Sequence, residues 1–189
     1  MSLFDKDLVE NEKPIQQRLK EEELISDCLF GATVVECNDP RAFVSKLEEV
    51  IRPNYHVLGK GVEAERLKKH QGRPVIRWNA KTFKKDDADG SMYQLSKLPK
   101  EPKPIVIIEN IADIPDGDRN IYDDPAHIEN VLLHSWKDDA IHLTYNGIPF
   151  QMNKWDYSVV FPVRRGDLQN LRHSISSDGF AYLLAEIEF

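Results

Sequence analysis

The sequence predicts an α/β domain in three layers, with a largely parallel central sheet and one β-hairpin. Short apolar stretches rich in β-branched residues alternate along the chain with stretches whose apolar residues recur at helical spacing. Such apolar strands are typical of parallel sheets, because helices cover both faces of those sheets. Asn146-Gly147, between two arms of alternating polarity, is the strongest short signal for a two-residue hairpin.

Length and composition favour one folded domain. A chain of 189 residues, of which 41% are hydrophobic and 30% charged, can bury a sizeable core. We expect residues 1–31 to form an N-terminal helical segment packed on a single domain of residues 32–189. The net charge of −7 argues against nucleic acid as the default partner, since phosphates attract positive surfaces.

Targeting and metal-binding signals are absent from the sequence. No apolar run approaches the about 18 residues that span a bilayer, and residues 1–12 lack the pattern of a signal peptide, so we expect a cytoplasmic protein without membrane contact. Cys28 and Cys37 stand without the companion Cys or His residues of a zinc site, and they specify no disulfide framework. We therefore expect two buried, reduced thiols, no metal and no cofactor.

The first half of the chain reads as a helix, a strand and a second helix. Pro14 and Gly31 bound the first helix, which carries one approximate apolar face formed by Ile15, Leu19, Ile25, Cys28 and Leu29. Residues 32–37 suit a buried strand. Asp39 then serves as an N-cap and Pro40 occupies the first turn of a helix whose apolar stripe consists of Phe43, Val44, Leu47, Val50 and Ile51.

The middle of the chain is less regular. Residues 56–61 fit either a short strand or a loop, and residues 62–72 predict a charged helix ended by Gly72. A strand pattern follows in residues 73–83. Residues 84–104, polar and punctuated by prolines, are predicted to be a surface loop.

The second half begins with the most apolar strand, at residues 105–111. Asp124 and Pro125 predict the start of a helix over 126–139, and the Asn-Gly hairpin follows at 141–152. Residues 156–165 predict a further buried strand and residues 166–176 a short helix. The apolar ending, residues 179–189, fits either a strand or a helix.

The order of elements from Ile105 to Arg165 resembles the second half of the core of AAA-type P-loop ATPases, particularly the Clp-type unfoldases. There a Walker B strand, a helix, a β-hairpin and a sensor-one strand follow one another in this way. Residues 32–51 are then similar to the strand, phosphate loop and helix that open such domains. The resemblance spans residues 32–189 as architecture and implies a P-loop NTPase-like fold.

The turn that would correspond to the phosphate loop departs from the family pattern. Such a loop needs glycines, a Lys for the phosphate charge and a Ser or Thr for magnesium, whereas this chain has Asn38, Asp39, Pro40 and Arg41. Pro40 lacks an N–H group, and Asp39 places negative charge where a phosphate would lie. We expect this degenerate Walker A turn to repel a triphosphate and Arg41 to be its only local cation. The alternative phosphate loop, residues 59–61, lacks the preceding strand and the following Lys-Ser/Thr pair.

The remaining site positions also differ from the family. A Walker B strand usually ends in a carboxylate pair, but here Glu109 is followed by Asn110, which cannot act as a base. Glu109 either matches an acidic position of the family or is a polar residue at a strand exit. With Asp113 of the following acidic loop it could hold a metal, although a solvated loop is the simpler interpretation. The sensor-one strand offers only Arg164 and Arg165 at its exit.

The resemblance also suggests a position for an arginine that acts in trans, Arg172, on the order of elements alone. The main concentration of basic residues is either an exposed helix face or a surface for an acidic partner or nucleic acid; it comprises Lys60, Arg66, Lys68, Lys69, His70, Arg73 and Arg77.

Taken together, these features predict a non-catalytic AAA-like domain that acts as a protein-interaction or assembly module. The predicted partner is another protein or a second copy of the chain, rather than nucleotide, nucleic acid or membrane. Two alternatives stay open: a divergent metal-dependent nucleotide hydrolase centred on Glu109, and a nucleic-acid-associated adaptor that uses the basic residues.

Overall fold

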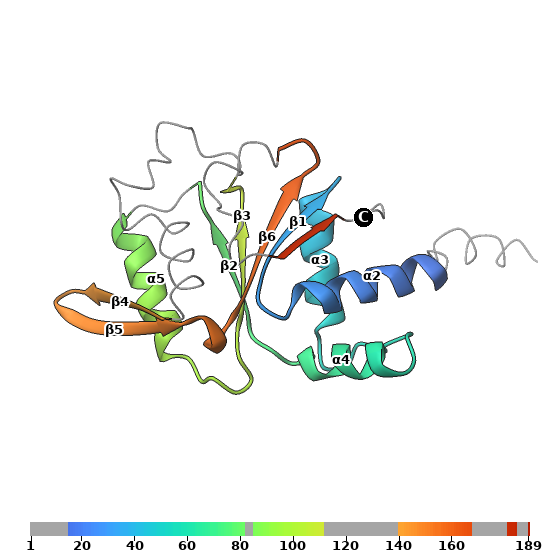
Figure 1. The fold of residues 1–189 in the computed structure, drawn as a ribbon, viewed down its shortest axis with the longest axis horizontal. Coiled ribbons are helices and arrows are strands. Elements are labelled where there is room, and N and C mark those ends of the chain that lie inside the picture. The colour runs from blue at the N-terminus through green and yellow to red at the C-terminus, as the bar shows by residue number, and fades with distance from the viewer. Residues whose placement is uncertain (1–14, 82–84, 112–139, 168–180, 185–188) are drawn as a thin grey trace, which may run out of the picture.

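A five-stranded sheet forms the centre of the domain (Figure 1). The computed structural model describes residues 15–81, 85–111, 140–167, 181–184 and 189. The strand order is β2-β3-β6-β1-β7, and every neighbouring pair is parallel. The strands are β1 (Ala32–Cys37), β2 (Val75–Asn79), β3 (Ile105–Glu109), β6 (Ser158–Arg164) and β7 (Ala181–Leu184). The predicted α/β class with a parallel sheet is confirmed.

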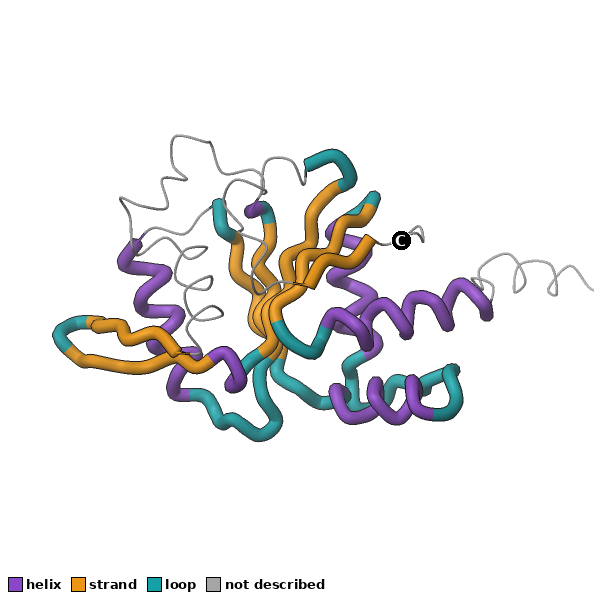
Figure 2. The backbone as a smooth tube through the Cα atoms, viewed as in Figure 1, coloured by secondary structure: helices purple, strands orange, loops and turns teal. Residues whose placement is uncertain are grey.

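Helices cover both faces of this sheet. One face carries α2 (Ile15–Cys28), α3 (Pro40–Val50) and α4 (Val62–His70). The other carries α5 (Lys85–Lys97) and the hairpin of β4 (Ala140–Tyr145) and β5 (Ile148–Asn153). Figure 2 shows the strands between these two groups. A short 3₁₀ helix, Lys154–Asp156, links β5 to β6.

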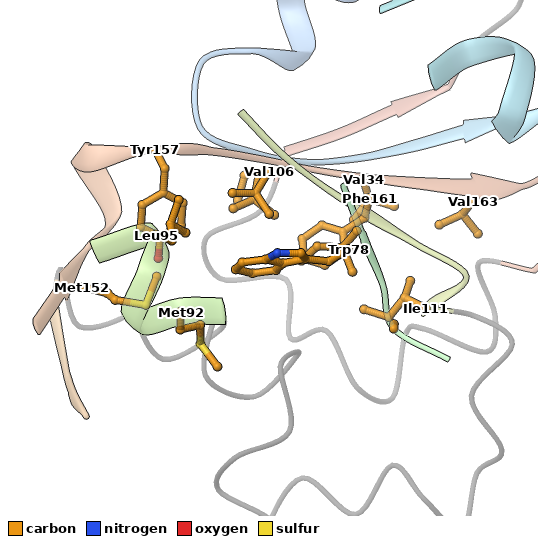
Figure 3. Close-up of a cluster of buried hydrophobic side chains, with 14 of the residues drawn as sticks. Val34, Trp78, Met92, Leu95, Val106, Ile111, Met152, Tyr157, Phe161 and Val163 are labelled. Atoms are coloured by element: carbon orange, nitrogen blue, oxygen red, sulfur yellow. The ribbon is translucent and has the colours of Figure 1, made fainter. Parts of the chain in front are cut away.

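Two hydrophobic clusters, one on each face, hold the layers together. In β3, Ile105 and Ile107 belong to the cluster under α2, α3 and α4, whereas Val106 and Ile108 belong to the cluster under α5 and the hairpin. This alternation follows from the two-residue repeat of a strand. Figure 3 shows the Trp78 indole in the middle of the second cluster.

The junction between β1 and α3 is as predicted. The Asp39 side chain caps α3 by accepting a hydrogen bond from the Ala42 N–H, and Pro40 occupies the first turn. Proline suits this position because the first N–H groups of a helix have no partner within it. The apolar stripe of α3 is buried as expected, with Phe43 and Leu47 fully covered.

The predicted hairpin is also confirmed. β4 and β5 are antiparallel with Tyr145 paired to Ile148, so Asn146 and Gly147 form a two-residue loop. Both have positive φ, 49° and 77° respectively. A type I′ turn requires this conformation, and Asn and Gly are the residues that adopt it most readily.

The predicted loop over residues 84–104 is wrong in its first part, because residues 85–97 form α5. Its prolines all follow the helix, and Met92 and Leu95, three positions apart, are buried in the cluster under the hairpin. Gly90 does not end the helix. A Cβ at that position would lie 3.2 Å from the Tyr145 ring of the hairpin, so the glycine permits close approach of β4.

Other expectations are resolved element by element. Residues 56–61 form no regular strand, and the ending contains β7, which pairs with β1. Ile25, Cys28 and Leu29 are fully buried, but Ile15 is 67% exposed because the amino end of α2 lies away from the sheet. The predicted helix over 126–139 and most of that over 166–176 lie outside the described residues.

Arg73 holds the amino ends of three strands together. Its side chain is buried, with 6% exposed, although the sequence suggested a surface cation. The guanidinium donates to the carbonyl oxygens of Lys103 (2.7 Å) and Pro104 (3.2 Å) before β3, to that of Leu29 (3.2 Å) before β1, and to Ser158 Oγ (2.7 Å) in β6. Burial lowers the Arg73 pKa to about 10, which still leaves the group charged at neutral pH.

Replacing Arg73 by Met should lower the free energy of unfolding by at least about 3 kcal/mol, since buried carbonyls would lose charged donors. Arg73→Lys should be intermediate, because an ammonium group lacks the planar fork that reaches all these acceptors. Urea unfolding followed by circular dichroism measures both. The exposed neighbour Lys69, changed to Met, is the control and should shift stability by less than about 0.5 kcal/mol. Equal effects of Arg73→Met and the control would contradict this role.

Stability should also fall on acidification because of His70. Its Nδ1 lies 2.9 Å from Arg73 Nη1 and must accept, since arginine only donates. Burial, with the nearby Arg73 charge, lowers the His70 pKa to about 4. Between pH of about 6.5 and about 4, His70 is therefore protonated in the unfolded chain but neutral in the folded chain, so lower pH favours unfolding. His70→Gln keeps an acceptor for Arg73 and should reduce the loss of urea midpoint between pH 7 and pH 5; an unchanged loss would refute the assignment.

Candidate functional site

The carboxyl ends of β1, β3 and β6 open onto a cleft of about 900 Å³, which we call the strand-end cleft. β6 lies between β1 and β3 in the sheet, so the three strand exits are adjacent. Ligands of open α/β sheets commonly bind at this edge. The described residues that line the cleft are Asn38, Asp39, Pro40, Arg41, Arg77, Asn79, Lys81, Glu109, Asn110, Ile111, Pro162, Val163, Arg164 and Asp167. The four residues that the sequence comparison set against a Walker A loop, Asn38 to Arg41, thus share one cleft with Glu109.

The turn after β1 forms a closed polar cap. Asn38 Oδ1 accepts from the Asp39 N–H at 3.1 Å, and Asp39 Oδ1 accepts from the Ala42 N–H at 3.1 Å. Pro40 has no N–H to offer. The start of α3 therefore binds the chain's own carboxylate, where an active phosphate loop would offer amides to an anion.

Further hydrogen bonds tie this turn to its neighbours. Arg165 N–H donates to the Cys37 carbonyl oxygen at 3.1 Å, and Gly166 N–H donates to Glu36 Oε1 at 3.2 Å, which joins the ends of β1 and β6. The Phe189 N–H also lies 3.5 Å from Asn38 Oδ1. Opening the turn to form an amide cradle would break several of these contacts.

Glu109 is paired with Arg77 from the adjacent strand. Arg77 donates from Nε to Oε2 at 3.0 Å and from Nη2 to Oε1 at 2.8 Å, and its Nη1 lies 3.7 Å from Glu48 Oε1 in α3. The hydrogen bond to Glu109 raises the Arg77 pKa. A carboxylate whose two oxygens both accept from one guanidinium is a poor metal ligand until that pair is broken.

The Arg77–Glu109 pair was missed by sequence reasoning, which assigned Arg77 to the basic stretch. Asn79, and not Arg77, lies directly opposite Glu109 in the β2–β3 register. Arg77 reaches Glu109 diagonally, two residues back along β2. Diagonal neighbours on one face of a sheet lie within reach of long side chains. The pair could therefore have been predicted from the sequence only if the β2–β3 register had been known.

Asn110 links the carboxyl ends of β2 and β3. It adopts a left-handed conformation with φ of 60°, which asparagine tolerates better than most residues. Its Nδ2 donates to Asn79 Oδ1 at 3.0 Å, and that oxygen also accepts from the Lys81 N–H at 3.1 Å. These contacts give Asn110 a structural task at the strand exit.

Three cations of the cleft make no ion pair with any described residue: Arg41, Lys81 and Arg164. All three are exposed, and they come from the start of α3, the exit of β2 and the end of β6. Among the described residues, the cleft is thus richer in unpaired positive charge than a chain of net charge −7 would suggest.

Other candidate sites gain less from the geometry. At the start of the alternative phosphate loop, the Gly59 N–H and the preceding Leu58 N–H donate to the buried Glu22 carboxylate at 2.9 and 2.8 Å. Those amides already bind an anion of the chain itself. Asp113 and Arg172 lie outside the described residues. Within the described ranges, no three His, Cys, Asp or Glu residues are grouped as metal ligands, and no helix could cross a membrane.

The basic stretch does not form one surface. Arg73 is buried at the amino ends of the strands, whereas Arg77 lines the cleft at the opposite end of β2. Arg66 lies 3.6 Å from Asp27, and Lys68 lies 3.0 Å from Glu65. These positions leave little of the concentrated positive surface on which the nucleic-acid alternative depends.

A double-mutant cycle should show strong coupling between Arg77 and Glu109. Arg77→Met, Glu109→Gln and the double variant are expected to give an interaction energy of about 1 kcal/mol, because the pair is bidentate and Glu109 is largely covered. Lys68 and Glu65, an exposed pair within α4, are the matched control at about 0.3–0.5 kcal/mol. Urea midpoints measure both cycles. Coupling no larger than in the control would mean that Glu109 is free to act chemically.

The strand-end cleft therefore combines a capped helix start, a neutralised Glu109 and three cations that described residues leave unpaired. Neither models of known protein families nor the curated protein sequences contain a match to this chain.

Proposed function

We propose that this chain is a non-catalytic AAA-like α/β domain that acts as a protein-interaction or assembly module. The observation that carries the proposal is the closed cap after β1, in which Asp39 occupies the start of α3 and Pro40 removes an amide. An ATPase of this type needs that position for the phosphates of its nucleotide.

The arrangement of the strands supports the AAA-like part of the proposal. If β1, β3 and β6 correspond to the phosphate-loop, Walker B and sensor-one strands, their three exits should share one cleft, as they do here. The hairpin also falls between β3 and β6 in the chain, as the resemblance requires. The architecture of such a core is thus compatible with this sheet.

The state of Glu109 supports the non-catalytic part. Phosphoryl transfer depends on magnesium held by carboxylates and on a residue that orients the attacking water. Glu109 already has both oxygens engaged by Arg77, and Asn110 donates to Asn79. A domain that keeps the fold while neutralising these positions retains its surfaces for assembly.

The competing function, a divergent nucleotide hydrolase, draws on the size of the cleft. A volume of about 900 Å³ is within the range of about 300–1,000 Å³ found for small-molecule sites. To work, this enzyme would have to release Glu109 from Arg77 and accept a triphosphate beside Asp39. The first step would break the ion pair between Arg77 and Glu109, and the second would bring like charges together at Asp39.

Isothermal titration with Mg-ATP and Mg-ADP tests the proposal. We expect no saturable heat for the parent chain or for Glu109→Gln, because the amides and the acid needed for nucleotide are already engaged. Micromolar binding of Mg-ATP that Arg41→Ala weakens about tenfold or more would overturn the non-catalytic assignment. Lys69→Ala, an exposed change on α4 away from the cleft, controls for nonspecific loss of positive charge.

A further inference from the structure

We infer that the strand-end cleft binds an acidic polypeptide segment of the partner protein. This inference rests on the proposed function and specifies the chemistry of the partner. The cleft at the carboxyl ends of β1, β3 and β6 supplies the volume, and its charges select the occupant.

The charge of the cleft favours an anionic occupant. Arg41, Lys81 and Arg164 are exposed and unpaired among the described residues, and they approach the cleft from three separate elements. Of the acidic lining residues, Glu109 is neutralised by Arg77 and Asp39 caps α3. Asp167 is then the acidic residue left to offset the three cations within the described lining.

The same lining favours a polypeptide over a phosphate compound. Phosphate sites in α/β proteins use a helix start and consecutive amides, and here Asp39 takes the start of α3. A triphosphate would place dense negative charge beside Asp39 and Asp167, whereas the carboxylates of a peptide are spaced and can meet the separated cations one at a time.

Amide side chains in the cleft also match a peptide backbone. Asn38 Nδ2 and Asn110 Oδ1 make no hydrogen bond to the described residues, although the other polar atom of each side chain does. This donor and this acceptor, which no described residue engages, can pair with the C=O and N–H groups of an extended segment.

Fluorescence anisotropy with a labelled peptide of about twelve residues, composed of Glu, Ser and Gly, tests the inference at low and physiological ionic strength. Binding should be saturable and weaken with salt, because the attraction is between exposed charges. A peptide with Lys in place of Glu should not bind. Arg41→Glu/Arg164→Glu should weaken binding of the acidic peptide by about tenfold or more.

Arg52→Glu/Lys69→Glu is the matched control, because it reverses two exposed charges away from the cleft and changes the net charge equally. It should stay within about twofold of the parent chain. Should the glutamate variant fail to fold by circular dichroism, Arg41→Gln/Lys81→Gln serves in its place and should still lose most of the affinity.

Three results would overturn the inference: no binding of the acidic peptide to the parent chain, equal losses in the cleft and control variants, or full displacement of the peptide by inorganic tripolyphosphate at equal concentration. The outcome is separable from that of the proposed function. If the parent chain binds neither the acidic peptide nor Mg-ATP, the inference of an acidic partner is wrong and the proposed function stands. If the parent chain binds Mg-ATP, the non-catalytic assignment itself is wrong.

Discussion

The buried guanidinium of Arg73 is the interaction on which the rest of the sheet depends. Parallel strands that are distant in sequence have no tight turn to set their register. Arg73 compensates by donating to backbone oxygens before β1 and β3 and to Ser158 at the start of β6. Ser158 Oγ in turn donates to the Leu29 carbonyl oxygen at 2.7 Å, so Arg73, Ser158 and Leu29 form a closed ring of hydrogen bonds. Because the strands are parallel and their amino ends are aligned, their carboxyl ends lie side by side at the other end of the sheet.

The polar groups at the two ends of the strands are satisfied in different ways. At the amino ends of the strands a buried cation, Arg73, donates to the carbonyl oxygens. At the carboxyl edge the chain uses side chains of its own, with Asp39 on the helix start and Arg77 on Glu109. In each of these contacts, a polar group that faces the cleft is bound by another part of the same chain. Within the described part of the chain, the positive charges of Arg41, Lys81 and Arg164 in the cleft stay without an ion-pair partner.

The location of the candidate site could be predicted from the sequence, but the contacts of its side chains could not. The strand ending at Glu109 and the polar turn at Asn38 were both expected, and their common cleft follows from the strand order. The ion pair of Glu109 could not be foreseen, because its partner, Arg77, lies 32 positions earlier in the chain. Helix α5 was missed for a related reason. Its sequence is polar with few apolar residues, and Met92 and Leu95 gain a buried surface only when β5 supplies Met152 and Phe150.

Local chemistry by itself determined the capped start of α3 and the Asn146-Gly147 turn, because those features depend on contacts between residues at most three positions apart and on intrinsic backbone preferences. The succession of short apolar strands and helix-spaced segments likewise predicted the α/β class and the parallel sheet. Only the tertiary structure decided which strands are neighbours and in what register. Those two facts bring Arg73 under three strands and Arg77 onto Glu109, and they arise from the packing of whole layers, which no short segment encodes.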